Sequence, residues 1–253
     1  MNAMNATGKR LSALAAAYGQ AAGEAIGETL WPTRCAVCDA PGEVLCGACR
    51  RALPYLDWWR ACPRCGAPMG RVQCTECNDV TMAALGRTAP PFDGCASATV
   101  FDDDSARVVR TWKDAGERRL AREMARAMAA YVPPAWRAND PVTVPIPAST
   151  RAVRTRGFDH GAELAGALGK EAGLPVAGVL APPRSRDQRA LSRAERVRNL
   201  ENRFRTLPGA DAPACALLVD DVYTTGSTLF AATDALRAAG TRTVYCLTFA
   251  RVW

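Results

Sequence analysis

Histidine is nearly absent from this sequence, since His160 is the only one among 253 residues. The chain also has no Gly-x-Ser-x-Gly elbow and no His-Glu-x-x-His motif. A histidine-based nucleophilic triad would have to depend on that one residue, so hydrolases of these kinds are disfavoured. The dinucleotide-binding fingerprint Gly-x-Gly-x-x-Gly is missing, and no glycine-rich loop ends in Gly-Lys-Ser/Thr, so a P-loop is excluded.

Long apolar runs are absent too. No stretch approaches the roughly 20 residues that a helix needs to cross a bilayer, so we expect no membrane insertion. Residues 1–29 place two basic residues before an alanine-rich run, which resembles a secretory signal. Gln20, Glu24 and Glu28 interrupt that run, and no clear cleavage site follows. We therefore interpret 1–29 as a helical or disordered lead-in and expect a cytoplasmic protein.

Acidic residues are outnumbered, because 32 Lys and Arg against 25 Asp and Glu give a net charge of +7. This surplus favours anionic partners such as phosphates or nucleic acid, without choosing between them. Residues 184–205 alone hold eight Arg and three acidic residues, a surplus of five, so most of the excess belongs to one segment.

Cysteine is abundant, and eight of the eleven cysteines form four Cys-x-x-Cys pairs: Cys35/Cys38, Cys46/Cys49, Cys62/Cys65 and Cys74/Cys77. Two-residue spacing lets both thiolates of a pair reach one tetrahedral ion, and two pairs complete a structural zinc site. The segment is short and poor in apolar residues, so it needs metals or disulfides to hold a shape. We predict a double zinc ribbon over 30–80 that binds two structural Zn²⁺ through these eight cysteines.

Other interpretations of the cysteines are less favoured. Disulfides would require an oxidising compartment, for which the sequence has no convincing export signal. A redox Cys-x-x-Cys usually occurs singly beside a βαβ pattern. The pairing stays open, because short loops favour two consecutive ribbons, 35–49 and 62–77, but a cross-braced arrangement fits the same spacing. The remaining Cys95, Cys215 and Cys246 lie in apolar, strand-like contexts and are interpreted as buried thiols.

From residue 93 onward, strand-like and helix-like segments alternate. We predict strands at 95–101, 141–147, 216–221 and 243–252, and helices at 105–132 (with a break near Gly116), 158–173 and 227–240. Strands separated by helices imply a mostly parallel sheet flanked by helices. The predicted fold class is therefore α/β, with 93–253 as one domain after the zinc ribbon. Ligands of such sheets bind at the carboxyl ends of the strands.

The stretch LLVDDVYTTGST, residues 217–228, lies at one of these strand ends. Asp220 and Asp221 are costly to bury, so we expect them to emerge where the strand stops. The turn that follows offers hydroxyls and one glycine before a helix: Thr224, Thr225, Gly226, Ser227 and Thr228. Unpaired N–H groups and the helix dipole favour an anion there. A phosphate beside carboxylates that suit sugar hydroxyls or a divalent cation indicates a ribose 5-phosphate; the alternative is a cluster that only caps the helix.

This stretch resembles the phosphoribosyl-pyrophosphate (PRPP) signature of type I phosphoribosyltransferases. Other blocks resemble one branch, the ComF/GntX family of competence-associated phosphoribosyltransferase-like proteins: LWPTRCAVC with the later Cys-x-x-Cys pairs, RTWKDAGERRLAREM, VPIPASTRAVRTRGFDHGAELA and RDQRALSRAERVRNLENRF. Together with the signature, these blocks cover 30–250. The resemblance implies a type I phosphoribosyltransferase-like parallel sheet, with PRPP as ligand and Mg²⁺ as its cofactor.

The resemblance also implies roles for individual residues. Asp220 and Asp221 would be the catalytic pair that contacts the ribose hydroxyls, and the turn after them would hold the 5-phosphate. The loop at Ala148, Ser149 and Arg151 would bind the pyrophosphate, with Mg²⁺ bridging it to the sugar.

Further basic residues are candidates for PRPP binding. Lys113, in TWKDAG, matches a lysine that recurs in the family. Arg154 and Arg156 can neutralise the charge of the pyrophosphate, although a solvated basic face is their alternative. The sequence RGFDH departs from the more usual RGFNQ of the family, so the roles of Asp159 and His160 stay open.

The arginine-rich segment 184–205 has two interpretations. It is either a solvated amphipathic helix or, with the loop before it, a flap that closes over PRPP and excludes water. Gln188, Arg196 and Asn199 match recurring positions of the family. We favour a hybrid, in which a mobile loop near 183–191 runs into a packed helix.

Two functions are consistent with the sequence. The first is an enzyme that transfers ribose 5-phosphate between PRPP and an unidentified nitrogenous base. The alternative is a non-catalytic PRPP- or nucleotide-binding protein that also binds single-stranded DNA during uptake in natural transformation. In that case Tyr55, Trp58 and Trp59 would stack on bases, and binding would fall steeply with salt. For these three aromatics we favour a small hydrophobic seam between the ribbon and the transferase domain.

Overall fold

The computed structural model describes residues 32–183 and 204–253. The predicted lead-in at 1–29 and the predicted flap or helix, with Gln188, Arg196 and Asn199, lie outside these residues. The chain divides into two compact units, 1–51 and 52–253. Among the described helices, none is long and apolar enough to cross a membrane.

The first unit is built around four cysteines. Its described part is a loop with an antiparallel bridge between Arg34 and Pro41, followed by helix α2, Gly47–Ala52. Arg34 donates hydrogen bonds to the carbonyl and the carboxylate of Asp39, at 2.9 and 3.0 Å. Few apolar side chains are buried here, as expected for a segment that depends on metal ions for its shape.

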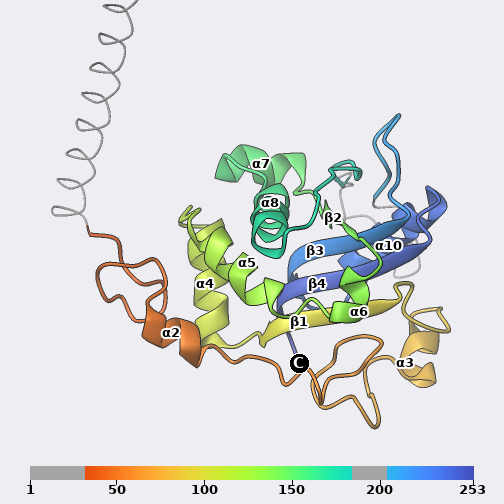
Figure 1. The fold of residues 1–253 in the computed structure, drawn as a ribbon, viewed down its shortest axis with the longest axis horizontal. Helices are drawn as coiled ribbons and strands as arrows, with labels where there is room; N and C mark the ends of the chain where they lie inside the picture. Colours follow the sequence, from red (N-terminus) through yellow and green to blue (C-terminus); the bar gives the residue numbers. More distant parts are fainter. Residues whose placement is uncertain (1–31, 184–203) are drawn as a thin grey trace, which may run out of the picture. The chain divides into compact units, whose positions relative to one another are not determined.

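The second unit contains a parallel sheet of four described strands in the order β1-β4-β3-β2 (Figure 1). The strands are β1, Gly94–Val100; β2, Val142–Pro145; β3, Cys215–Tyr223; and β4, Thr243–Arg251. The central strands are buried almost throughout, as is usual where helices cover both faces. The predicted α/β fold with a parallel sheet is confirmed.

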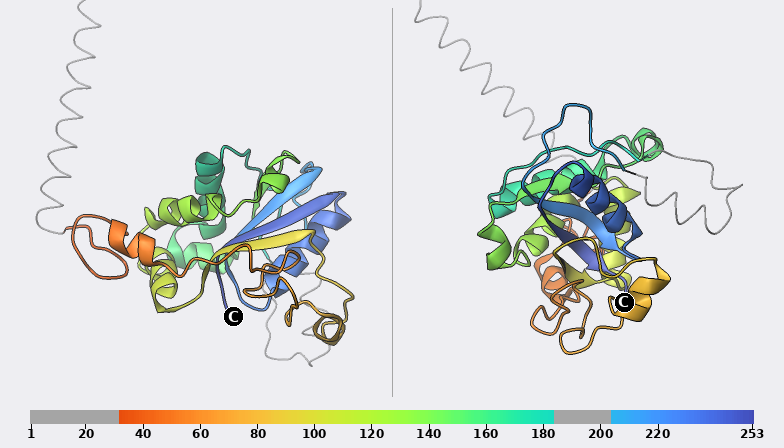
Figure 2. Two further views of the ribbon diagram at one scale, coloured as in Figure 1. Left: turned by 60° about the horizontal axis from the view of Figure 1, so that its bottom comes forward. Right: turned by 90° about the vertical axis from the view of Figure 1, so that its right-hand side faces the viewer.

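Helices cover the two faces of this sheet (Figure 2). Helices α5, Leu120–Ala129, and α8, His160–Ala172, pack against each other and on the strands, while α10, Ser227–Ala238, packs on β3 and β4. Leu120, Met124 and Met128 recur at four-residue spacing in α5 and are fully buried, which gives that helix its apolar face.

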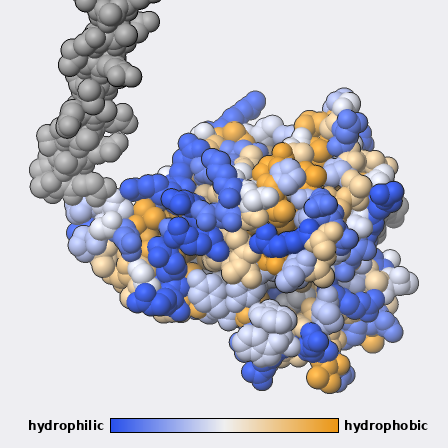
Figure 3. All heavy atoms as spheres, in the orientation of Figure 1, coloured by the Kyte–Doolittle hydropathy of each residue, from blue (hydrophilic) through white to orange (hydrophobic). Residues whose placement is uncertain are grey.

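Four further helices are described in the second unit. They are α3, Asp79–Ala84; α4, Asp103–Lys113; α6, Pro134–Arg137; and α7, Thr150–Arg156. Helix α4 begins with a capping box, in which the Asp102 carboxylate accepts the N–H of Ser105 and the Ser105 hydroxyl accepts the N–H of Asp102. Figure 3 shows hydrophilic residues over much of the visible face, with apolar residues between them.

Strand β3 is longer than predicted. It continues past Asp221 to Tyr223, because Val222 and Tyr223 pair with Ala250 and Arg251 of β4. Asp220 and Asp221 therefore lie three and two residues before the end of the paired strand, rather than at its last residues as predicted.

Candidate functional site

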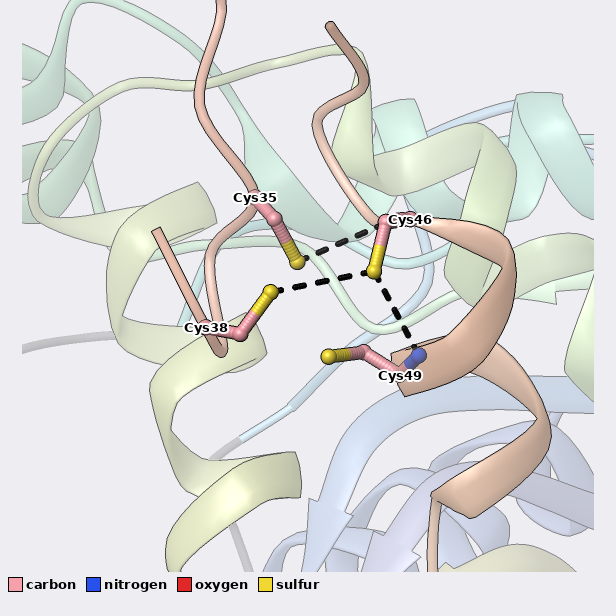
Figure 4. Close-up of side chains that lie close together, drawn as sticks. All are labelled: Cys35, Cys38, Cys46 and Cys49. Carbon is pink, nitrogen blue, oxygen red and sulfur yellow. Dashed lines mark hydrogen bonds between the residues drawn. The ribbon is translucent and has the colours of Figure 1, made fainter. Parts of the chain in front are cut away.

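The eight Cys-x-x-Cys residues form two separate groups. The first cysteine group (Cys35, Cys38, Cys46 and Cys49) and the second cysteine group (Cys62, Cys65, Cys74 and Cys77) each bring their sulfur atoms within 4.8 Å of one another. Figure 4 shows the first group, whose side chains converge from a loop and from α2. The predicted arrangement of two consecutive ribbons is confirmed, and the cross-braced alternative is wrong.

The geometry of both groups fits zinc. Four sulfur atoms at about 2.3 Å from one tetrahedral ion lie about 3.8 Å apart. The Sγ–Sγ distances are 3.8 Å for Cys38 and Cys46, 3.6 Å for Cys62 and Cys77, and 3.5 Å for Cys65 and Cys74. All positions around each ion would be filled by cysteine, so these are structural sites without an open position for catalysis.

Within each group the pKa values of the thiols move apart. Burial and hydrogen bonds to neighbouring cysteines raise the pKa of Cys49 in the first group and of Cys77 in the second. A hydrogen bond with Cys62, together with burial, raises the pKa of Cys65, whereas one thiol in each group has a lowered pKa. The pKa of Cys35 is lowered to about 6, because backbone hydrogen bonds, foremost from Cys38 and Cys46, outweigh the effect of burial. A side-chain hydrogen bond with Cys65 lowers the pKa of Cys62 to about 4. The three other cysteines, Cys95, Cys215 and Cys246, are buried free thiols, as predicted.

The second cysteine group packs against the sheet. Its loop contains Gly66, whose φ of 72° belongs to the left-handed region, and a Cβ there would lie 2.5 Å from the carbonyl oxygen of Cys95 in β1. Only glycine fits so close to the strand. Cys62, Cys65 and Cys77 are therefore part of the same buried cluster as the apolar side chains of β3 and α10.

The acidic pair (Asp220 and Asp221) lies near the carboxyl end of β3. The Asp221 side chain is 6% exposed, and its Oδ1 accepts a hydrogen bond from the Lys113 Nζ at 2.7 Å. Asp220, which directly precedes Asp221 in the strand, is half-buried. Burial, together with the adjacent Asp221 carboxylate, raises the pKa of Asp220 well above its usual value, although the Lys113 charge opposes the shift.

The hydroxyl-rich turn (residues 224–228) joins β3 to α10. Gly226, with a φ of 77°, is the N-cap residue, and the first turn of α10 contains no acidic residue. The hydroxyls of Thr225 and Ser227 are 2.8 Å apart, and both threonines at 224 and 225 are exposed. The helix N-terminus, with its unpaired N–H groups and hydroxyls, is chemically suited to an anion.

A cavity of about 600 Å³ opens between the end of α4 and helix α7. Its lining consists of Lys113, Asp114, Ala115, Gly116, Ser149, Arg151, Ala152, Thr155 and Arg156. The lining thus contains three cationic residues and one acidic residue, Asp114, whose carboxylate lies 3.3 Å from the Arg156 guanidinium. We call this space the basic cavity.

Four of the predicted PRPP-binding residues meet at the basic cavity: Lys113, Ser149, Arg151 and Arg156. Lys113 also contacts Asp221, so one side chain connects the cavity to the acidic pair. Arg154 is exposed and does not line the cavity. Ala148 is buried next to the loop, and the Ser149 hydroxyl caps α7 by accepting the N–H of Ala152 at 3.2 Å.

The two residues whose roles were open, Asp159 and His160, lie at the start of α8. The Asp159 carboxylate accepts the N–H of Ala162 at 3.0 Å and that of Ala148 at 3.3 Å, so it caps the helix and holds the loop that precedes α7. An asparagine at this position could accept the same bonds through its amide oxygen.

His160 lies edge-on to Trp112, with 5.8 Å between ring centroids. Its buried Nδ1 has no hydrogen-bond partner among the described residues. Burial, reinforced by the positive charge of Lys113, lowers the pKa of His160 to about 4, so the imidazole is neutral at pH 7.

Four residues near the candidate site were not predicted from the sequence. Asp114 and Thr155 line the basic cavity, while Tyr223 and Arg251 lie behind the hydroxyl-rich turn. Asp114 and Thr155 each directly follow a predicted PRPP-binding residue, which is only a weak sequence indication that they line the same cavity. The positions of Tyr223 and Arg251 depend on pairing between strands and had no local signal.

Comparison with known proteins identifies the N-terminal part. Residues 26–81 match the family model of a double zinc ribbon domain. The match spans both cysteine groups and ends before β1. No curated protein matches the chain. The region around the eight cysteines is therefore a double zinc ribbon, in agreement with its geometry.

Proposed function

We propose that the chain is a PRPP-binding phosphoribosyltransferase-like protein of the ComF type, which transfers ribose 5-phosphate between PRPP and a nitrogenous base. The observation that carries the proposal is the bridging position of Lys113. Lys113 lines the basic cavity, and its ammonium group binds Asp221 at 2.7 Å. A site for a highly charged leaving group would thus adjoin a site for sugar hydroxyls. The double zinc ribbon supports the ComF type.

The three parts of PRPP correspond to three features of the second unit. The hydroxyl-rich turn would hold the 5-phosphate at the N-terminus of α10. The acidic pair would accept hydrogen bonds from the ribose hydroxyls. The pyrophosphate would occupy the basic cavity, where Lys113, Arg151 and Arg156 supply positive charge.

The chemistry requires little covalent participation by the protein. When the bond between the anomeric carbon and pyrophosphate breaks, positive charge develops on the sugar and negative charge on the leaving group. The cationic side chains of the basic cavity would stabilise the leaving group. Mg²⁺, which prefers oxygen ligands, would add charge neutralisation, and the acidic pair offers carboxylate oxygens near the place where PRPP would bind.

The test of turnover is release of pyrophosphate from PRPP in the presence of Mg²⁺ and a panel of nitrogenous bases. We expect release that depends on one class of base, and a decrease of about 10² or more in the Asp220→Asn/Asp221→Asn variant. PRPP binding without turnover for any base would favour the non-catalytic alternative.

A second function, binding of single-stranded DNA, is favoured by the exposure of two tryptophans. Trp58 is 68% and Trp59 56% exposed, in edge-to-face contact with a centroid distance of 6.0 Å. The predicted hydrophobic seam is therefore wrong for the two tryptophans. Tyr55 does take part in such packing, because its ring stacks on that of Tyr131 with 6.3 Å between centroids. Arg60, Arg64 and Arg71 follow the tryptophans in the same loop region, so stacking and phosphate contacts would be available together.

The DNA-binding function is tested with a fluorescent oligo-dT at several salt concentrations. We expect affinity to fall with salt and the Trp58→Ala/Trp59→Ala variant to bind at least about tenfold more weakly, because base stacking contributes about 1–3 kcal/mol per base. Val80→Ala is the matched control, since Val80 is 81% exposed but has no aromatic face. Equal binding by wild type and the tryptophan variant would contradict this function.

A further inference from the structure

A fully buried cation lies behind the hydroxyl-rich turn. Arg251, at the end of β4, is 0% exposed, and it is the register partner of Tyr223 at the end of β3. Its guanidinium carbon lies 3.8 Å from the centroid of the Tyr223 ring. A guanidinium over an aromatic face in a desolvated site is a favourable cation–π contact, so the two side chains hold each other.

The partners of Arg251 come from the second cysteine group and its loop. The Nη1 donates to the carbonyl oxygen of Cys65 at 2.6 Å, and the Nη2 donates to the Glu76 carboxylate at 2.9 Å. The Nε has no partner among the described residues. A buried cation is costly unless it is paired, so the position of Arg251 depends on the segment between Cys65 and Cys77.

Tyr223 in turn supports the hydroxyl-rich turn. A Cβ at Gly226 would lie 2.5 Å from the Tyr223 hydroxyl and 3.1 Å from the Phe230 ring. The backbone of the turn therefore rests directly on the tyrosine. One continuous row of contacts leads from the loop of the second cysteine group through Arg251 and Tyr223 to Gly226.

We infer that Arg251 and Tyr223 are positioning residues, through which the second cysteine group, with its zinc ion, holds the hydroxyl-rich turn in the conformation that binds phosphate. A metal ion at this group would fix the Cys65 carbonyl and the segment that carries Glu76, and so give the buried guanidinium its partners. The effect on PRPP affinity rests on the proposed function; the effect on the turn itself does not.

The test begins with hydrogen–deuterium exchange of the full chain, loaded with zinc. In Glu76→Ala, amides of residues 224–230 should exchange roughly 3- to 30-fold faster than in wild type, the range expected for residues that couple two sites. Glu76→Gln should restore much of the protection, because its amide oxygen can accept from Arg251. Asp79→Ala is the matched control, since it removes an exposed carboxylate from the same region and should leave the turn unchanged.

A second variant removes a zinc ligand. Cys74→Ser should bind one ion fewer and show the same faster exchange at 224–230, while amides of β2 keep their protection. If Cys74→Ser unfolds and loses the protection of β2 as well, Glu76→Ala alone decides. Unchanged exchange at 224–230 in Glu76→Ala would overturn the inference.

Calorimetric titration with PRPP then separates this inference from the proposed function. If wild type binds PRPP, Glu76→Ala should bind roughly 3- to 30-fold more weakly, and Asp79→Ala should bind as wild type does. Equal affinity of Glu76→Ala and wild type would overturn the link to ligand binding. If wild type does not bind PRPP, the proposed function fails, and the exchange experiment still decides whether the zinc loop holds the turn.

Discussion

At the scale of single residues, the ion pair between Lys113 and Asp221 is the contact with the largest consequences. The side chains are 19% and 6% exposed, so neither charge is well hydrated. Removing one partner of such a pair leaves an uncompensated charge, whereas removing both does not. The pair therefore contributes to stability as well as to the arrangement of the site.

Replacement of Lys113 by Met should lower the free energy of unfolding by about 3 kcal/mol, because Asp221 stays buried without its partner. The double variant Lys113→Met/Asp221→Asn should recover part of that loss. Urea denaturation of the four proteins in this cycle measures both effects. Losses that simply add up would show that the two side chains do not interact.

His160 offers a prediction for pH. Burial and the charge of Lys113 lower its pKa to about 4; Arg156 acts in the same direction, while Asp221 and Asp159 oppose the shift. The unfolded chain, with a histidine pKa of about 6.5, takes up a proton first as the pH falls. The folded state therefore loses stability between pH 6.5 and 4, and the contribution of neutral His160 is fully present above that range.

This prediction is accessible to measurement because the chain has one histidine. In NMR, its imidazole signals should titrate near pH 4, if the protein is still folded there, and not near 6.5. Between pH 7 and 5, wild type should lose more unfolding free energy than His160→Asn, which cannot take up the proton. Parallel pH profiles of the two proteins would argue against a neutral buried imidazole.

At the scale of elements, the hydroxyl-rich turn depends on Gly226. An alanine there meets the Tyr223 hydroxyl at 2.5 Å and must adopt a positive φ. We expect Gly226→Ala to lower stability by about 2–4 kcal/mol, from crowding and backbone strain together, and to abolish PRPP binding.

Gly209→Ala is the control for Gly226→Ala. Gly209 has a φ of 73° but open space around its Cβ position, so alanine there should cost only the backbone term of about 1–2 kcal/mol and leave PRPP binding intact. Thermal unfolding and calorimetry compare the two variants. Equal stabilities and equal PRPP affinities would mean that the turn does not rest on Tyr223.

The elements themselves were largely predictable from the sequence. Apolar patterns indicated the four described strands and the helices α4, α5, α8 and α10, with a break near Gly116 between α4 and α5. A glycine stop was also indicated for α8, and Gly173 indeed follows that helix with a φ of 68°. Helix α7 was not predicted, because none of its residues is buried and the sequence TRAVRTR therefore has no apolar periodicity. The helix begins at the Ser149 N-cap and ends at Gly157, which has a left-handed conformation. The extension of β3 to Tyr223 depends on pairing with β4, which no local pattern indicates.

At the scale of the whole molecule, the two cysteine groups belong to different compact units. The sequence indicated all eight ligands, because the spacing within each pair is a local signal. The contacts of the second group with β1 and Arg251 were not predictable, since they join residues far apart in the chain. The candidate site was predicted in the same way: its motif residues were evident, but the bridge from Lys113 to Asp221 was not.

Zinc content follows from this arrangement. Freshly reduced protein should contain about two zinc ions per chain by elemental analysis. Acidification should release them, because protons compete for the thiolates, and unfolding should occur at lower temperature once the ions are lost. Protein without zinc that keeps the same unfolding temperature would refute the structural role of both groups.

The central claim is that PRPP binds at the acidic pair, the hydroxyl-rich turn and the basic cavity, and calorimetric titration with PRPP tests it most directly. Wild type should bind PRPP in the presence of Mg²⁺ and bind weakly or not at all without it. The Asp220→Ala/Asp221→Ala variant, checked for an unchanged zinc content and a cooperative unfolding transition, should lose at least about 10² in affinity. No binding by wild type under either condition, or equal affinity in the double variant, would contradict the account.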